Sequence, residues 1–500
     1  MGGVESSQLA EVPPGFEYMC IVINKPDGVR VLHGGDRELV IIKEAIEESW
    51  KLGFDADQKT KCHGYVKSFK LSGTPFEKGS PQKFALEARK MFSQILWKLN
   101  NAGWKLLMTT DLSRKMAFGT FFFVKQETIS ISYPFPCINI SSSDKLQFIN
   151  FFQNLYPSIK GVIEENWSPG IQFVYTEDEH MLDVQLFGDP WKGMGTETVE
   201  ARSLIQKLIE FAAKNQLALC CSANIKNTAD SLFFKHEPRF ESGIVSPFVT
   251  ISLNRDNRLR LINAKPELVP VVRKVIEDAW GWRKGIRKEG DYCGSFEFEL
   301  HGSPWWSSDK ESIMARHMIA KLLEAMQCHG WHAVGAFDVS RRTSNKSVFI
   351  FQQSAPLSTP IMCLSPSNTD QLRLINAPPD VVQVCREIIT KRWPKGIQKE
   401  KEKLTEPGVS CLQFTLNGTP WDGENDDKYY VRSMLCFILQ ALMQKNWKVI
   451  VSGDVSAKYK EDDDDVKFPT DVHSWWLMQL DPSATLLDAP PSYDSIMGKH

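Results

Sequence analysis

The sequence has no apolar segment that approaches the roughly 18 residues of a membrane-spanning helix. Its first residues also lack the apolar stretch of a signal peptide, because Glu5, Glu11 and Glu17 interrupt it. The formal net charge is −2 and the pI is near 6.6, so there is no global basic field to hold nucleic acid. We therefore expect a cytoplasmic protein with no nucleic-acid partner, lying on membranes peripherally at most.

Recognised catalytic and metal-binding motifs are also missing. The chain has no GxSxG, HExxH, Walker or GxGxxG pattern, and its eleven cysteines form no CxxC pair, which suits a reducing compartment. Cys328, His329 and His332 have metal-like side chains, but they occur in one place without a second pair of ligands. We interpret them as a surface grouping and expect no catalytic residue, no metal and no cofactor.

What the sequence does contain is repetition. One loop motif occurs four times, as LSGTPF (71–76), LFGDPW (186–191), LHGSPW (300–305) and LNGTPW (416–421). Its glycine recurs with a period of 115, 114 and 116 residues, at Gly73, Gly188, Gly302 and Gly418. This period is too long for a solenoid of short repeats, and each unit is large enough to have its own core.

Other residues keep the same spacing. A tryptophan precedes each motif, at Trp50, Trp167, Trp280 and Trp393. An arginine follows it, at Arg89, Arg202, Arg316 and Arg432. A short polar residue comes 22 residues after each arginine, at Asp111, Asn224, Asp338 and Asp454. The pattern predicts four homologous domains at 16–128, 129–243, 244–356 and 357–482, between terminal segments 1–15 and 483–500.

The third copy shows the expected plan of each domain. Residues 248–254 and 258–264 alternate like two strands, and residues 266–280 have the apolar spacing of a helix. A strand at 295–302, a second helix at 309–331 and a closing hairpin follow. The order ββαβαββ predicts an α+β domain, with an antiparallel sheet and both helices on one face.

The repeated loop is interpreted as scaffold. Glycine and proline turn the chain between the middle strand and the second helix. The aromatic residue beside the proline, which is Trp191, Trp305 or Trp421 in three copies, is expected to plug the space between sheet and helices. A fold needs its turn in every copy, whereas a functional site needs only one.

The recurrent arginines allow two interpretations. Arg316 and Arg432 each share a helical face with apolar residues and therefore need a polar partner. In the first interpretation each forms a structural ion pair with the aspartate of its own copy, Asp338 or Asp454, and Arg89, Arg202 and Asp111 are structural repeat positions as well. In the second, the arginine lines a pocket and holds a carboxylate or phosphate ligand. Asn224 replaces the acid in copy two but still accepts a hydrogen bond, which suits the structural role.

Two basic runs follow the first predicted helix of copies three and four, at 282–290 and 391–403. They could contact anionic headgroups or RNA, but glutamates interrupt them. We expect solvated loops here.

The C-terminal segment contains PPSY, from Pro490 through Pro491 to Tyr493. This resembles the PPxY ligands of WW domains, in which prolines preform a polyproline II helix for an aromatic groove. The resemblance covers four residues and implies recruitment of a WW-domain protein, such as a HECT-type ubiquitin ligase.

The N-terminus reads MGGVESS, in which Gly2 and Ser6 fit the N-myristoylation pattern. One myristoyl chain binds membranes only marginally, so membrane contact would be transient.

Two functions remain open from the sequence. The favoured hypothesis is a non-enzymatic adaptor that recruits a WW-domain protein through PPSY and contacts membranes transiently. The alternative is a ligand-binding or enzymatic protein whose pocket uses the Arg/Asp pairs of the repeats.

Overall fold

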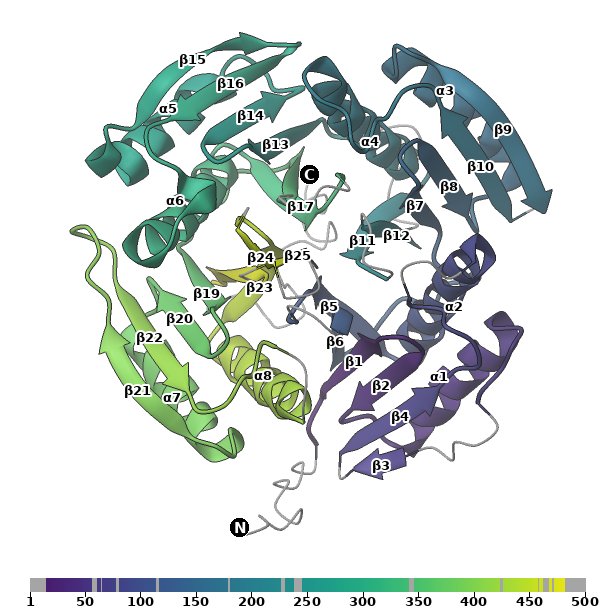
Figure 1. Cartoon of the computed structure of the whole chain (residues 1–500), viewed down its shortest axis with the longest axis horizontal. Coiled ribbons are helices and arrows are strands. Elements are labelled where there is room, and N and C mark those ends of the chain that lie inside the picture. The colour runs from purple at the N-terminus through teal and green to yellow at the C-terminus, as the bar shows by residue number, and fades with distance from the viewer. Residues whose placement is uncertain are drawn as a thin grey trace.

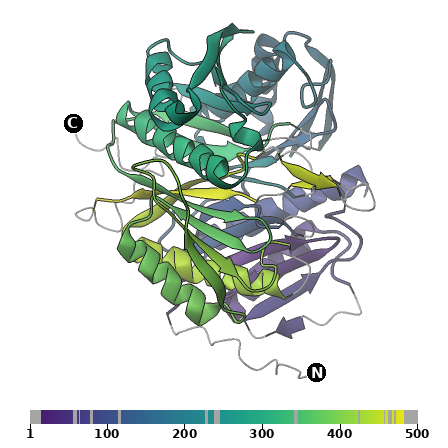
Figure 2. The same ribbon diagram turned by 60° about the vertical axis from the view of Figure 1, so that its left-hand side comes forward.

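A computed structural model describes residues 15–55, 61–63, 65–77, 81–113, 117–178, 180–225, 230–237, 245–340, 346–422, 426–456, 458–461, 467–469 and 472–481. Within these ranges the chain forms four α+β repeats arranged as a ring (Figure 1). Figure 2 shows the ring from another side, with repeats 2 and 3 in the upper half of the view and repeats 1 and 4 in the lower half. The predicted fold class, four tandem α+β domains with antiparallel sheets, is confirmed.

Each repeat follows one element order. Repeat 1 contains β1 (Tyr18–Asn24), β2 (Gly28–Leu32), α1 (Asp36–Ser49), β3 (Lys61–His63), β4 (Val66–Lys70), α2 (Gln82–Asn101), β5 (Trp104–Thr110) and β6 (Ala117–Lys125). Repeat 2 contains β7 (Cys137–Ser141), β8 (Lys145–Ile149), η1 (Gln153–Leu155), α3 (Tyr156–Asn166), β9 (Ile171–Asp178), β10 (Met181–Leu186), α4 (Thr196–Lys214), β11 (Leu217–Ala223) and β12 (Ser231–His236).

The second half of the chain repeats this order. Repeat 3 contains β13 (Phe248–Asn254), β14 (Arg258–Ile262), α5 (Leu268–Trp280), η2 (Gly281–Arg283), β15 (Ile286–Tyr292), β16 (Ser295–Leu300), η3 (Pro304–Trp306), α6 (Asp309–Cys328), β17 (Trp331–Phe337) and β18 (Val348–Gln353). Repeat 4 contains β19 (Ile361–Ser367), β20 (Gln371–Ile375), α7 (Pro379–Arg392), β21 (Ile397–Glu402), β22 (Cys411–Leu416), α8 (Asp427–Gln444), β23 (Trp447–Gly453), β24 (Tyr459–Glu461), β25 (Lys467–Pro469) and β26 (Ser474–Gln479).

The main sheet of every repeat has six strands, one more than the sequence predicted, and repeat 4 also has a separate hairpin of β24 and β25. The sheet order in repeat 1 is β3-β4-β2-β1-β6-β5, and the other three sheets match it. The additional strand lies at the outer edge and includes part of each basic run, in β15 and β21, so the prediction of solvated loops was wrong there. The reason is that an edge strand is exposed and carries charge, as IQKEKE of β21 does, so it lacks apolar alternation.

The first two strands of a repeat form a hairpin, and a helix from the preceding repeat packs on one face of this hairpin. Helix α4 packs on β13 and β14, α6 on β19 and β20, and α8 on β1 and β2. Helix α2 reaches repeat 2, where Ser93 Oγ donates to the carbonyl of Phe135 at 2.5 Å. Strands such as β1 and β13 are therefore buried along their whole length.

The contact between α8 and β1 closes the ring from repeat 4 back to repeat 1. Strands β5, β11, β17 and β23 surround the central axis, each beside the next (Figure 1). Apolar clusters run across the repeat boundaries, and one of them joins Cys20 and Val22 of β1 to Leu435 and Ile438 of α8. Each of the four apolar clusters therefore spans the boundary between two neighbouring repeats.

Candidate functional site

The repeated loop is held by two tryptophans. The upstream indole donates to the carbonyl that precedes the loop glycine, as Trp393 Nε1 does to Asn417 O at 3.0 Å. The tryptophan inside the motif, Trp421, has no exposed surface and donates to Gln371 O at 2.9 Å. Gly418 has φ of 89°, a left-handed conformation that favours glycine. The tip of the turn, Asn417 and Gly418, is exposed, and the two indoles that anchor it are buried. The motif is thus a surface turn held by buried tryptophans.

The same clamp occurs in the other copies. The upstream donors pair as Trp50 with Ser72 O, Trp167 with Phe187 O and Trp280 with His301 O. The motif tryptophans pair as Trp191 with Lys145 O and Trp305 with Arg258 O. Phe76 takes the motif position in copy one and is fully buried.

The recurrent arginines lie at the boundaries between repeats. Arg316 is 2% exposed; its Nη1 donates to Ser312 O at 3.0 Å on its own helix. Its Nε donates to Ser474 Oγ in repeat 4 at 2.9 Å. The hypothesis of an ion pair with Asp338 placed this guanidinium within one repeat, whereas the structure directs it to the next, because α6 packs on the sheet of repeat 4.

Equivalent contacts are made around the ring. Arg89 Nε donates to Ser231 Oγ at 2.8 Å, and Arg432 Nε donates to Thr120 Oγ1 at 3.1 Å, across the closing boundary. Arg202 Nη1 donates to Thr198 O on α4 at 2.8 Å, while Val348 occupies the position that carries a hydroxyl at the other three boundaries. Three of the four arginines, Arg89, Arg316 and Arg432, therefore tie neighbouring repeats together through a hydroxyl.

The recurrent aspartates end the innermost strand of their repeats. Asp111, Asp338 and Asp454 each accept a hydrogen bond from the backbone N–H two residues later, at Ser113, Ser340 and Ser456. This is the local turn that Asp side chains favour, and it explains the Asp-x-Ser spacing. Asp454 also donates its own N–H to Ser347 Oγ of repeat 3 at 2.9 Å.

The main chain at these positions links all four repeats. In each case a backbone N–H at or near the start of the last strand of one repeat donates to the carbonyl of the recurrent Asp or Asn in the next. These bonds join Gly119 N to Asn224 O (2.9 Å), Asp230 N to Asp338 O (3.0 Å), Ser347 N to Asp454 O (2.9 Å) and His473 N to Asp111 O (3.0 Å). The recurrent Asp or Asn that the sequence spacing identified is therefore one of the residues that join neighbouring repeats into a ring.

Acidic side chains gather near the axis. Asp230 is 6% exposed and accepts the N–H of Asp338 at 2.9 Å. Burial raises the pKa of Asp230 to about 7 and that of Asp111 to about 6. Burial, together with the charge of Asp230, raises the pKa of Asp338 well above its usual range. Asp111 and Asp230 also line a central cavity of about 10 Å³, which is at the lower limit for one water molecule.

Basic groups surround this acidic cluster. Lys346 is buried, and burial lowers its pKa to about 8. Burial also lowers the pKa of His473 to about 4, so this imidazole is neutral near pH 7. The charges of Arg432 and Arg202 lower the pKa of Asp111 and Asp338 respectively, against the larger effect of burial. The cluster couples the four repeats electrostatically.

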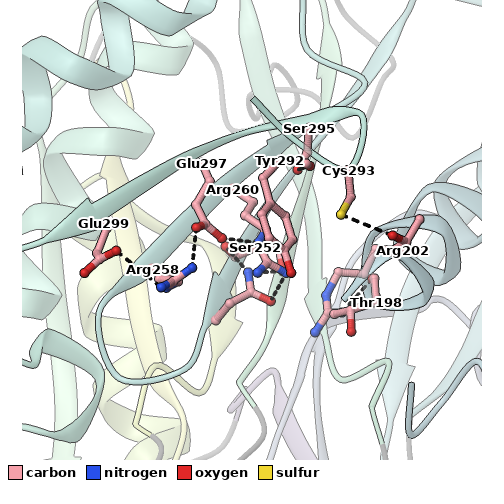
Figure 3. A network of polar contacts seen from close by, with 12 residues as sticks. Thr198, Arg202, Ser252, Arg258, Arg260, Tyr292, Cys293, Ser295, Glu297 and Glu299 are labelled. Carbon is pink, nitrogen blue, oxygen red and sulfur yellow. Dashed lines mark hydrogen bonds and ion pairs between the residues drawn. The ribbon is translucent and has the colours of Figure 1, made fainter. Parts of the chain in front are cut away.

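A polar network at the boundary of repeats 2 and 3 was missed from the sequence (Figure 3). Arg260 is 4% exposed; its Nε donates to Glu297 Oε2 at 2.6 Å and its guanidinium lies 4.1 Å from the centre of the Tyr292 ring. Arg258 bonds Glu297 at 2.6 Å and Glu299 at 3.3 Å. The sequence did contain a signal for this network. Arginines alternate with leucines in RLRLI, glutamates alternate with phenylalanines in SFEFEL, and the two charged sets lie opposite each other when β14 pairs with β16.

The remaining predicted sites lie apart from these clusters. Cys328 and His329 are exposed; His329 Nδ1 is 2.8 Å from Ala325 O and His332 Nε2 is 2.7 Å from Ala355 O. In the part of the chain that the structure describes, no group of His, Cys, Asp or Glu is arranged to hold a metal ion. Gly2 and the PPSY residues Pro490, Pro491 and Tyr493 lie outside the described residues.

Comparison with known proteins gives a family but no function. The model of one domain family matches the chain four times, at residues 17–129, 134–235, 247–352 and 360–478. No curated protein and no solved structure matches the chain. Among the described residues, no helix is both long and apolar enough to cross a membrane.

Proposed function

Since the chain belongs to this domain family, with four copies in tandem, we propose that it is a non-enzymatic adaptor that recruits a WW-domain protein. The observation that carries the proposal is the use of the recurrent polar residues within the fold. The Arg side chains bond their own helices and the next repeat, and the Asp side chains cap turns at the axis. A ring built in this way is suited to presenting surfaces and terminal motifs from one rigid body.

The alternative, a pocket built on the Arg/Asp pairs, has less support. Arg316 and Arg432 are buried, with 2% and no exposed surface, and each donates both to its own helix and to the neighbouring repeat. A ligand-binding arginine needs donors directed into an accessible cleft. We therefore assign these arginines to repeat packing.

Recruitment would depend on PPSY, which follows β26 and the end of the fourth family match. Two prolines and a tyrosine would occupy a WW groove, and a partner of this kind is a HECT-type ubiquitin ligase. The proposal also includes transient membrane contact through a myristoyl group on Gly2. A single acyl chain gives weak, reversible binding.

The test is calorimetric titration of the full chain with a WW domain from a HECT-type ligase. We expect a dissociation constant of about 1–100 µM, because few side chains offset the ordering of a free tail. Tyr493→Ala should abolish binding, whereas Tyr175→Ala, which changes an exposed tyrosine of β9, should leave it unchanged. Equal binding by the Tyr493→Ala variant would contradict the proposed role of PPSY.

A further inference from the structure

One loop breaks the fourfold regularity of the ring. In repeat 4, residues 403–410 connect β21 to β22, whereas the corresponding strands of repeats 2 and 3 are joined by only two residues, 179–180 and 293–294. The longer loop crosses onto repeat 3, where Lys403 Nζ lies 3.4 Å from Asp309 and Glu406 lies 2.5 Å from Lys310 Nζ. An insertion in one copy of a repeated fold is not needed for the fold itself, and binding residues are often found on such loops.

The loop covers a cavity of about 320 Å³ between α5 and α6. This volume is at the lower end of the range for small-molecule sites, which is about 300–1,000 Å³. Apolar walls come from both helices and from the loop. They include Ala279, Trp282, Met314, Pro407 and Val409.

His317 supplies a defined hydrogen-bond donor to this cavity. Its ring is 6% exposed, and Nδ1 lies 2.7 Å from Asn376 Nδ2. The orientation of Asn376 is fixed because its Oδ1 accepts from Ser410 N at 3.2 Å, so Nδ2 donates to the imidazole. Burial lowers the pKa of His317 to about 4, which keeps the ring neutral. The ring proton is therefore on Nε2, for which no partner is found among the described residues.

Charged groups of opposite sign flank the cavity. Lys321 lies one helical turn after His317 on α6, on the same face of the helix. Asp278 of α5 and Glu406 of the loop contribute carboxylates. Each of the three charged groups already has a partner, since Lys321 pairs with Glu324 at 2.7 Å, Asp278 with Lys274 at 3.0 Å and Glu406 with Lys310 at 2.5 Å. These pairs are at least partly exposed and therefore weak, so a ligand can exchange with them. The Trp282 indole Nε1, next to these groups, is buried and has no hydrogen-bond partner in the described chain. The cavity thus combines donors on α6, acceptors on α5 and the loop, and an aromatic wall.

We propose that this cavity binds a small zwitterion of amino-acid size, with an apolar or aromatic body. Its carboxylate would accept hydrogen bonds from His317 Nε2 and Lys321, and its ammonium group would pair with Asp278 or Glu406. The body would pack on Trp282 and Met314. This site goes beyond the adaptor role, because it would make the contact between repeats 3 and 4 depend on a metabolite.

The first test is ligand-observed NMR of the full chain with each standard L-amino acid at about 1 mM. We expect saturation transfer to apolar or aromatic amino acids, with dissociation constants of about 0.1–1 mM for ligands of this size. If L-phenylalanine binds, 3-phenylpropanoate and 2-phenylethylamine, which each lack one charge, should bind at least about tenfold more weakly. Absence of binding by every amino acid, or equal binding of the three aromatic compounds, would overturn the proposal.

Variants then locate the site. His317→Leu removes the Nε2 donor and should weaken binding about tenfold, as should Lys321→Met, which changes a half-exposed side chain and spares the core. His329→Leu is the matched control, because His329 is an exposed histidine at the end of the same helix. Retained binding in both His317→Leu and Lys321→Met, with folding confirmed by circular dichroism, would place the ligand elsewhere and refute the assignment.

Discussion

Replacing Asp230 by Asn should stabilise the ring at alkaline pH and leave its stability nearly unchanged at acid pH. Asp230 is buried near the axis and accepts the N–H of Asp338 at 2.9 Å. Asn can accept the same hydrogen bond through its carbonyl oxygen. The substitution therefore removes a buried negative charge while it keeps the bond that joins repeats 2 and 3.

The sign follows from the direction of the pKa change. Burial raises the pKa of Asp230 from 3.8 to about 7, so the folded chain holds a proton that an unfolded chain has already lost. Well below pH 3.8 both states are protonated and there is no penalty. Between about pH 4 and pH 7 the unfolded chain loses this proton while the folded chain keeps it, so the free energy of unfolding falls across this window and is level above it.

The size of the effect follows from the same difference. About three pKa units, at 1.36 kcal/mol each, correspond to roughly 4 kcal/mol above pH 7. Asp111 and Asp338 titrate in the same cluster and share part of this cost. We therefore expect Asp230→Asn to raise the free energy of unfolding by about 2–4 kcal/mol at pH 8, and by less than about 0.5 kcal/mol at pH 4.

Urea unfolding of the full chain, followed by tryptophan fluorescence at both pH values, measures the change. Asp291→Asn is the control, because Asp291 is an exposed residue of edge strand β15 and its substitution should have little effect at either pH. Destabilisation by Asp230→Asn of similar size at pH 4 and pH 8 would refute the reasoning. It would mean that the carboxylate contributes a specific contact whose value exceeds the cost of its burial.

Three further substitutions test the scaffold and the N-terminus. Trp421→Ala should lower the free energy of unfolding by about 3–5 kcal/mol, measured by urea titration, because it empties a fully buried aromatic site. Arg316→Ala should cost about 1–3 kcal/mol, because it removes the buried hydrogen bond that links repeats 3 and 4, whereas Arg287→Ala on exposed β15 should change the melting curve little. Gly2→Ala should abolish incorporation of a labelled myristate analogue and shift any membrane-bound fraction to the supernatant; no incorporation into the unmodified chain would end this hypothesis.

The repeated architecture could be predicted from the sequence because its signals are local. The loop glycines, the upstream tryptophans and the apolar faces of the helices recur at fixed spacing, and each marks a turn or a buried position within one repeat. The second helix of copy three, expected at 309–331, is α6 at Asp309–Cys328. The edge strands β15 and β21 were missed because they are exposed and charged on both faces.

The ring closure could not be predicted from one sequence in the same way. The bond from His473 N to Asp111 O joins residues at opposite ends of the chain, and no local pattern marks such a pair. The arginine was correctly expected to need a polar partner, but helical spacing could not distinguish a partner in its own repeat from one in the next. FVTISLN of β13 alternates like a half-exposed strand, yet it is buried along its whole length because α4 of the preceding repeat packs on it.

Where one repeat differs from the other three, it contains residues that the shared fold does not need. The residues that close the ring vary little in chemistry. Three boundaries use an arginine and a hydroxyl, and the fourth has Val348 at the position of the hydroxyl. The loop at 403–410 differs in kind, because it adds chain to one repeat and uses it to roof a cavity on another. A closed ring holds such a cavity at a fixed geometry, because neither flanking repeat can move without straining the other two boundaries. We therefore expect the ligand-binding residues of this protein among those that occur in one repeat, and not among those that recur four times.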